Sequence, residues 1–201
     1  MKTKFTRLLG IMLASAFMLT GCGGGQPASS EGVEATETAQ VETTTASGEA
    51  KIAKLISGPE PGSLHPALSQ GTHESIILDH VFEGLMKRDA DGNIIPGTAE
   101  SYEVSEDELT YTFKIRQDAK WSNGDPVTAR DFEVAWKYAL APETASDYAY
   151  QLYYLVGAED YNVGIGSADE VGVKALDDTT LEVKLASPTA YFLELCAFYT
   201  Y

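Results

Sequence analysis

Few residues in this chain of 201 residues could do chemistry: three histidines, two cysteines and some closely spaced aspartates. His73 and His80 are separated by about two helical turns and could share one face of a helix. No cysteine or histidine cluster has zinc-site spacing, so we interpret all three histidines, His65 included, as solvent-facing or hydrogen-bonded. We therefore predict no metal and no cofactor.

Catalytic motifs are also missing from the sequence. It contains no G-x-S-x-G, H-E-x-x-H or P-loop pattern, which argues against hydrolase chemistry and nucleotide binding. The aspartate pairs Asp89 with Asp91 and Asp177 with Asp178 occur in turn sequences, which favours a structural role. Cys196 lies in an apolar segment and is expected to be an unreactive core residue. We predict that the protein is not an enzyme.

Cys22 is the residue with the clearest chemistry. A basic start (Lys2, Lys4 and Arg7) and an apolar run over residues 8–19 come before it. That run is shorter than the ~20 apolar residues that a membrane-spanning helix needs. The run ends in Leu19-Thr20-Gly21-Cys22, which resembles a bacterial lipobox, where small residues admit the signal peptidase and the thiol accepts diacylglycerol. We predict a lipoprotein signal peptide at residues 1–21 and a lipid anchor on Cys22; the alternative is an ordinary signal peptide with an incidental cysteine.

Residues 22–50 are predicted to be a lipidated cysteine followed by a disordered tether. After three glycines the segment consists largely of Ser, Thr, Ala and Glu, with no aromatic residue, lysine or arginine. Such a composition cannot bury enough apolar surface to offset the entropy of ordering. The folded part is therefore expected to begin near Lys51 and to continue through residue 201.

The elements that would position a site are clearest between residues 111 and 140. Tyr111, Phe113 and Ile115 alternate with polar residues, which predicts a strand with one buried face. Residues 122–126 read Ser-Asn-Gly-Asp-Pro, a turn sequence.

A helix is expected to follow this turn. Thr128 is the predicted N-cap, and Asp131, three residues later, can complete a capping box. The apolar residues of the helix recur at helical spacing: Phe132, Ala135, Trp136 and Ala139. We expect the two tryptophans, Trp121 and Trp136, to anchor the packing between the strand and this helix.

The remaining folded segments give weaker predictions. We expect a first strand at 52–56, β structure mainly at 94–116 and 171–185, the latter as a hairpin turning at Asp177-Asp178, and a last helix at 191–198. A helix is predicted at 74–86, with an apolar face formed by Ile77, Leu78, Val81, Phe82 and Leu85. The tyrosines of residues 147–157 favour a partly buried helix face, with a ligand platform as the alternative.

The central stretch also carries a family resemblance. Residues 111–132 read Y-T-F-K-I-R-x-x-A-K-W-S-N-G-D-P-V-T-A-x-D-F, which resembles the signature of the oligopeptide-binding proteins of solute-binding protein family 5. Shorter stretches agree in the same order: S-L-x-P-A-L at 63–68, F-E-G-L at 82–85, P-G-x-A-E-S-Y at 96–102 and S-E-D-x-L-T-Y-T-F at 105–113. A match of this length is far more specific than a short motif.

The resemblance implies the fold and its organisation. Members of the family have a type II periplasmic-binding-protein fold of mixed α/β class, with two lobes around a buried peptide. By this resemblance, residues 51–82 begin the domain of the large lobe and residues 83–201 form the smaller β-rich domain inserted into it. The remainder of the large lobe and the whole second lobe have no counterpart, so we interpret the chain as an N-terminal fragment or as the product of an interrupted reading frame.

The resemblance also implies where a peptide would bind. Gln70, Gly71 and Thr72 correspond to an extended strand that hydrogen-bonds the main chain of the peptide, and Tyr148 to a tyrosine over the peptide backbone. A characterised relative has an acid where this sequence has Gln70. The acid that captures the amino terminus of the peptide belongs to the missing lobe.

Two functions from different classes follow. The first is a lipid-anchored receptor at the extracytoplasmic face of the cell membrane, a monomer that delivers oligopeptides to the permease and ATPase of an ABC importer. The alternative is a surface lipoprotein that acts as an adhesion or interaction module without transport. Removing residues 1–21 takes away three positive charges and no acid, so the formal charge changes from −16 to −19. A protein this acidic is not expected to bind nucleic acid.

Overall fold

The computed structural model describes Lys54 and residues 58–201, all within one unit of the chain, residues 52–201. The predicted signal peptide, Cys22, the tether and the predicted strand at 52–56 (Lys54 apart) lie outside the described residues. The helices are α1 (Thr72–Val81), α2 (Ala129–Leu140), α3 (Ala158–Asn162) and α4 (Phe192–Leu195), with 3-10 helices η1 (Pro66–Leu68), η2 (Pro142–Thr144), η3 (Ala149–Leu152) and η4 (Ala168–Glu170). The strands are β1 (Met86–Arg88), β2 (Ile94–Pro96), β3 (Ala99–Val104), β4 (Thr110–Ile115), β5 (Val173–Ala175) and β6 (Thr180–Lys184). The fold is mixed α/β, as predicted.

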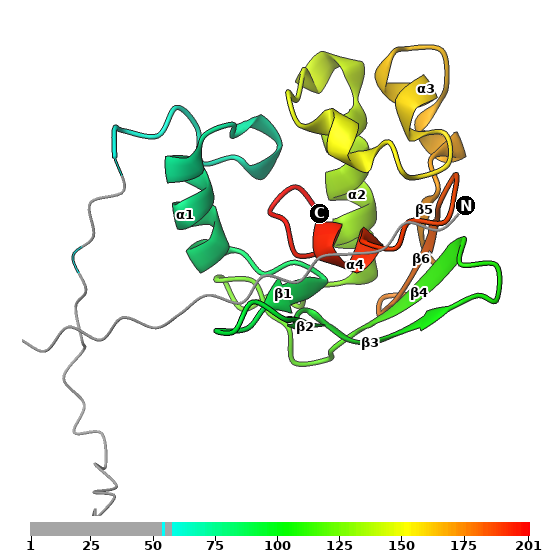
Figure 1. The fold of residues 1–201 in the computed structure, drawn as a ribbon, viewed down its shortest axis with the longest axis horizontal. Coiled ribbons are helices and arrows are strands. Elements are labelled where there is room, and N and C mark those ends of the chain that lie inside the picture. Colours follow the sequence, from blue (N-terminus) through cyan, green and yellow to red (C-terminus); the bar gives the residue numbers. More distant parts are fainter. Residues whose placement is uncertain (1–53, 55–57) are drawn as a thin grey trace, which may run out of the picture. The chain divides into compact units, whose positions relative to one another are not determined.

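Strands β3, β4, β6 and β5 form an antiparallel sheet in the order β3-β4-β6-β5, which Figure 1 shows at the lower right with α2 above it. The predicted strand at 111–115 is confirmed, because Tyr111, Phe113 and Ile115 are buried while the residues between them are not. On the neighbouring strand, Leu181 pairs with Phe113 and Val183 with Tyr111, so one face of the sheet is apolar. The predicted hairpin is confirmed as β5 and β6, and β1 and β2 form a separate two-stranded sheet.

Helix α2 covers the apolar face of the sheet. It begins as predicted, because the Asp131 carboxylate accepts hydrogen bonds from the backbone N–H of Thr128 at 2.7 Å and from its hydroxyl at 2.9 Å. The helix packs against β5 and β6. Its buried residues are Ala129, Phe132, Trp136, Ala139 and Leu140. Ala135, which the spacing placed on this face, is exposed.

The two tryptophans have different environments. Trp136 is fully buried, and its ring meets Tyr201 edge-on at 5.0 Å between ring centroids. Trp121 is 43% exposed, so the prediction that both tryptophans anchor the core is wrong for Trp121. The reason is local: Trp121 exchanges hydrogen bonds with Gly124 and Asp125 and so belongs to the turn itself rather than to the packed strand.

Helix α1 begins earlier and ends earlier than the predicted helix at 74–86. It spans Thr72–Val81, and Phe82 already has extended backbone angles, φ −118° and ψ 156°. The carbonyl of Leu85 then accepts hydrogen bonds from the backbone of Gly97 and Ala99. Pairing with a distant segment therefore overrides the local helical pattern at residues 82–86.

The predicted apolar face of this helix is also corrected. Leu78 is fully buried, but Val81 is 64% exposed and Phe82 is 41% exposed. Leu85 is buried, although in the strand region rather than in the helix. Helix α1 is thus held by few apolar contacts within the described residues.

The segments after η2 are more irregular than predicted. The tyrosine-rich run forms only the 3-10 helix η3 and turns, and the last helix is reduced to α4. Phe192 of α4 lies in the core against Tyr111, 4.8 Å between ring centroids. Cys196 is fully buried, and burial raises the pKa of its thiol well above the ordinary value, in agreement with an unreactive core cysteine. None of the helices between residues 58 and 201 is long and apolar enough to cross a membrane.

Candidate functional site

The predicted ligand segment lies between η1 and α1. Ser69 and Gly71 both have extended backbone angles, φ −86° with ψ 140° and φ −101° with ψ 158°. Thr72 is the first residue of α1, so the prediction of an extended strand over residues 70–72 is wrong for Thr72. The segment of residues 69–71, extended at Ser69 and at Gly71, leads directly into the helix.

The structure brings Gln70 and Tyr148 together, although they are far apart in the sequence. The Tyr148 hydroxyl donates a hydrogen bond to the backbone carbonyl of Gln70 at 2.9 Å. The side-chain amide of Gln70 donates to the carboxylate of Asp147, the residue before Tyr148. Both halves of the predicted site therefore meet at one place on the surface.

Further aromatic residues support this contact. The ring of Tyr148 meets Phe198 and Tyr199 edge-on, at 5.9 and 6.3 Å between ring centroids. The Tyr199 hydroxyl donates a hydrogen bond to the carbonyl of Ser69 at 3.3 Å. Burial, with smaller contributions from nearby groups such as Tyr148, raises the pKa of Tyr199 to about 12, so its hydroxyl is a neutral donor at physiological pH. We call residues 69–71 with Tyr148 and Tyr199 the ligand wall.

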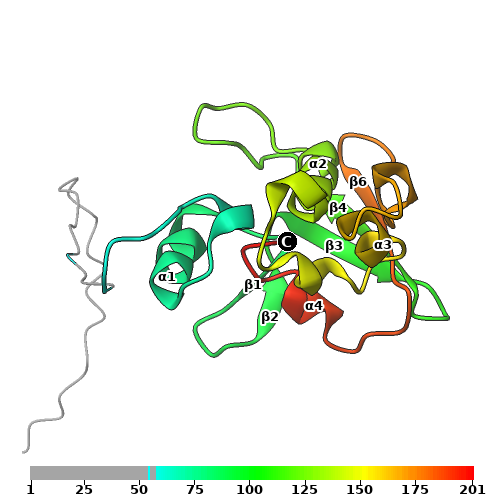
Figure 2. The same cartoon turned by 90° about the horizontal axis from the view of Figure 1, so that it is seen from above.

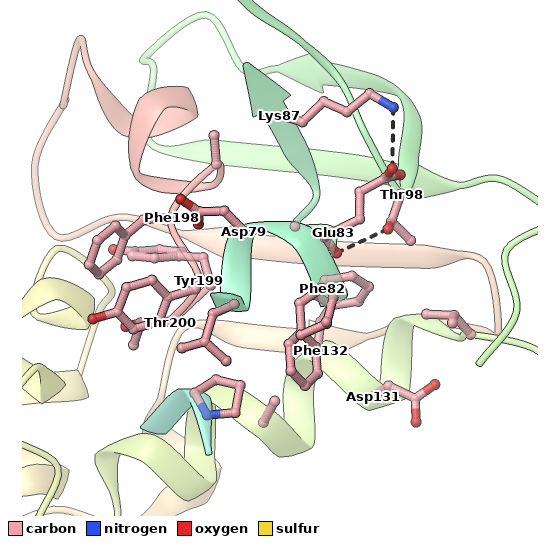
Figure 3. Close-up of a pocket in the computed structure, with 18 of the residues that line it drawn as sticks. Asp79, Phe82, Glu83, Lys87, Thr98, Asp131, Phe132, Phe198, Tyr199 and Thr200 are labelled. Carbon is pink, nitrogen blue, oxygen red and sulfur yellow. Dashed lines mark hydrogen bonds and ion pairs between the residues drawn. The ribbon is translucent and has the colours of Figure 1, made fainter. Parts of the chain in front are cut away.

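A large groove of about 1370 Å³ lies beside the ligand wall, between α1 and α2. The C-terminal residues run through it, and Figures 1 and 2 both show the C-terminus between these two helices. Phe82, Phe132, Phe198 and Tyr199 all line the groove, and Figure 3 draws Phe82 and Phe132 near the centre of the view and Phe198 and Tyr199 to the left. Much of its lining is apolar, including exposed residues of α1 and α2.

One charged cluster borders the groove. The Glu83 carboxylate lies 3.2 Å from Lys87 and 3.2 Å from Arg116, and the Glu83 carbonyl accepts a hydrogen bond from Thr98 (Figure 3). These side chains are partly exposed, so each ion pair contributes only ~0–1 kcal/mol. The cluster fixes the chain where it leaves α1 and enters β1.

The polar residues singled out in the sequence have structural partners. His65 Nδ1 accepts a hydrogen bond from the backbone N–H of Ala67, and His80 Nδ1 lies 2.6 Å from a carbonyl of its own helix. The carboxylate of Asp89 accepts hydrogen bonds from Asn93, which lower its pKa, and Asp177 similarly accepts from Thr179. Within the described part of the chain, no three His, Cys, Asp or Glu side chains are grouped to hold a metal ion.

Three residues at or beside this site were not predicted from the sequence: Asp147, Tyr199 and Glu74, whose carboxylate lies against Gly71. Asp147 and Tyr199 reach the ligand segment only through tertiary folding. Glu74 stands near the start of α1, where an acid is common, so the sequence offered no signal beyond helix capping. What the wall offers chemically is recognition: backbone groups, aromatic surface, and two tyrosine hydroxyl oxygens that can still accept a hydrogen bond, because their O–H groups already donate to Gln70 and Ser69.

A comparison with known families identifies the chain. The sequence model described as "Bacterial extracellular solute-binding proteins, family 5 Middle" matches residues 93–201, more than half of the chain. This chain belongs to family 5 of the bacterial extracellular solute-binding proteins. The family resemblance inferred from residues 111–132 is thereby confirmed.

Named relatives of this family 5 chain are peptide-binding proteins. It is 56% identical to the oligopeptide-binding protein OppA of Bacillus subtilis over 142 residues, which cover 71% of this chain and 26% of the relative. It is 40% identical to the dipeptide-binding protein DppE of the same organism over 187 residues, 93% of this chain and 33% of the relative. The chain therefore spans about a quarter to a third of the length of these relatives.

Solved structures agree with the sequence matches. The crystal structure of Haemophilus influenzae OppA in complex with RPPGFSPFR matches with a TM-score of 0.70 and 41% identity, over 72% of this chain and 28% of that one. The substrate-binding domain of an oligopeptide ABC transporter from Bacillus anthracis matches with a TM-score of 0.67 and 47% identity. The fold is that of part of a type II periplasmic binding protein, as predicted.

Proposed function

We propose that this chain is part of a lipid-anchored, extracytoplasmic receptor that captures oligopeptides for an ABC importer. The observation that carries the proposal is the ligand wall: two segments nearly eighty residues apart, at Gln70 and Tyr148, meet through a direct hydrogen bond. The peptide-binding titles of the relatives are consistent with that role. No chemical step is part of the proposal.

A peptide would bind to the wall by strand addition. The extended backbone at residues 69–71 can pair with the main chain of a ligand, which gives affinity without reading its side chains. The Gln70 carbonyl already accepts a hydrogen bond from Tyr148, but a carbonyl oxygen has two lone pairs and can accept a second one from the ligand. The aromatic ring of Tyr148 would then cover the backbone of the peptide.

The organisation into domains is a further part of the proposal. Residues 51–82 would begin the large lobe, and residues 83–201 would form the inserted β-rich domain. The open groove between α1 and α2 supports this division, because exposed residues such as Val81 and Phe82 leave an apolar surface that additional chain can cover. The relatives are longer than this chain, and their additional residues would cover this surface and form the second lobe.

Cys22 would attach the receptor to the membrane. Acylation of this residue after removal of residues 1–21 would leave several acyl chains on one cysteine, enough for stable anchoring. We expect Cys22→Ala to abolish metabolic labelling with palmitate. Equal incorporation of palmitate into the variant would exclude Cys22 as the anchor.

The transport role can be tested in cells that produce the protein. Deleting its gene should reduce uptake of a radiolabelled tripeptide, and restoring the wild-type gene, but not a Tyr148→Ala version, should recover that uptake. Undiminished uptake combined with weaker attachment of the cells to surfaces would favour the adhesion module instead. A monomer that works with a permease and an ATPase is the expected form of the receptor.

A further inference from the structure

A buried acid lies directly beneath the ligand wall. Glu74, in the first turn of α1, is only 5% exposed, although glutamate rarely occupies such positions. Its Oε1 accepts a hydrogen bond from the backbone N–H of Gly62 at 2.9 Å and lies 3.0 Å from Nε2 of His73. The carboxylate therefore joins the loop before η1 to the beginning of α1.

The second oxygen of Glu74 faces the ligand segment. Oε2 is buried and has no hydrogen-bond partner among the described residues. A Cβ atom placed on Gly71 would lie 2.1 Å from Oε2, so only glycine allows this approach of the carboxylate to the backbone. Buried acceptors normally have a hydrogen-bond partner, so the unpaired Oε2 calls for a physical explanation.

The surroundings of Glu74 keep it ionised. The hydrogen bond from Gly62 is the main reason that its pKa is lowered, and the N–H groups at the start of α1 act in the same direction. Its negative charge, with that of Asp79, also contributes to the raised pKa of Tyr199, which donates to Ser69. Glu74 thus lies against Gly71, at the end of the segment that leads into α1.

We propose that Glu74 is a positioning residue for the ligand wall: its carboxylate accepts a hydrogen bond from Gly62 through Oε1 and packs against Gly71 through Oε2, so that the loop before η1 stays against the start of α1 and the backbone leading into Gly71 stays extended for ligand pairing. The inference rests on the proposed function, in which this segment pairs with the main chain of a peptide. It adds a residue that does not touch the ligand but fixes the backbone that does. Oε2 then lacks a hydrogen-bond partner because one carboxylate is placed against two backbone segments and bonds only to the first.

Hydrogen exchange in the whole chain tests the structural step directly. In Glu74→Ala we expect the amide of Gly62 to exchange at least about tenfold faster, as for the loss of a hydrogen bond to a charged acceptor. Glu74→Gln keeps an acceptor at Oε1 and should recover most of the protection. Glu60→Gln removes an exposed charge from the same loop and serves as the matched control. Unchanged exchange at Gly62 and Gly71 in Glu74→Ala would overturn the proposal, whatever the ligand does.

A ligand titration tests the functional step. Adding tri-alanine to the labelled chain should shift the amide resonances of residues 69–71 in the wild type at millimolar concentrations. Glu74→Ala should need at least about tenfold more peptide, with Glu74→Gln between the two and Glu60→Gln like the wild type. Equal affinity of wild type and Glu74→Ala would exclude a positioning role. If even the wild type fails to respond at millimolar tri-alanine, the ligand wall by itself does not bind this peptide, and the exchange measurement alone decides the role of Glu74.

Discussion

Helices α1 and α2 face the same groove but are held in different ways. Helix α2 buries a full face, including Phe132, Trp136 and Leu140, against a sheet whose apolar side chains are complementary. Helix α1 buries only Glu74 and Leu78 and leaves Val81 exposed. The first is a core helix, and the second is attached at its N-terminal end and open along its side.

This difference separates the part of the chain that contains the core from the part that carries the proposed ligand segment. Residues 83–201 contain nearly all of the buried core, whereas residues 58–82 contribute Ala67 to it. Yet residues 69–71 belong to the weakly held part and reach the core through Tyr148 and Tyr199. A binding segment with few contacts of its own can adjust when a ligand or a second lobe arrives.

The largest effect is expected at the core helix. Trp136→Ala removes a fully buried ring that packs against Tyr201 and should lower the free energy of unfolding by ~3–5 kcal/mol. Chemical denaturation followed by circular dichroism measures this loss. Trp121→Ala is the matched control and should change stability by less than ~0.5 kcal/mol, because that ring is 43% exposed. A loss below ~1 kcal/mol for Trp136→Ala would contradict the assignment of α2 as the core helix.

A smaller and more local effect is expected at α1. Leu78 is fully buried, and Leu→Ala changes at packed sites cost ~2–5 kcal/mol. Because α1 has few other apolar contacts, we expect Leu78→Ala to speed amide exchange in α1 by the equivalent of ~2 kcal/mol while exchange in β4 and β6 stays slow. Equally faster amide exchange in α1 and in the sheet would show that the two regions unfold together. That result would contradict the difference between α1 and α2 described above.

Capping of α2 should contribute about 1 kcal/mol. Asp131→Ala removes the carboxylate that accepts two hydrogen bonds from Thr128, so the free energy of unfolding should fall by that amount. Asp131→Asn retains an acceptor and is expected to lose less. If thermal unfolding of both variants matched the wild type, the capping box would have no energetic role.

The smallest effect concerns the link between the two regions. Tyr148→Phe keeps the ring but removes the hydrogen bond to Gln70, worth ~0.5–1 kcal/mol on a partly exposed site. We expect faster exchange at residues 69–72 and no change in β4. Tyr150→Phe, which alters a neighbouring exposed tyrosine, is the control. If the amides of residues 69–72 exchange as slowly in Tyr148→Phe as in the wild type, other contacts hold the ligand segment.

The sequence predicted the sheet and α2 well because their signals are local. The alternation of Tyr111, Phe113 and Ile115 and the spacing from Thr128 to Asp131 each determine an element without distant partners. The same reasoning extended α1 to residue 86, because a helical apolar pattern cannot show that Leu85 pairs with Gly97 and Ala99. The exposure of Trp121 was missed for a different reason: its backbone hydrogen bonds with Gly124 and Asp125 are local, and they place Trp121 in the turn rather than in the packed strand.

The candidate site was only partly accessible from the sequence. Gln70 and Tyr148 were selected through the family resemblance, and their direct contact could not be inferred from spacing. Tyr199 and Asp147 join them only in the folded chain. The role of Glu74 could not be predicted, because a sequence does not distinguish a buried acid from an exposed acid in the first turn of a helix.

We propose that this chain supplies one wall of a binding site that needs another lobe. Isothermal titration calorimetry of residues 51–201 with a short peptide such as tri-alanine tests it most directly. An open wall leaves the ends of the ligand in water, where exposed ion pairs contribute only ~0–1 kcal/mol each. We therefore predict binding in the millimolar range or weaker, equivalent to ~4 kcal/mol or less. Micromolar binding by residues 51–201 alone would show a self-contained site and would contradict the account.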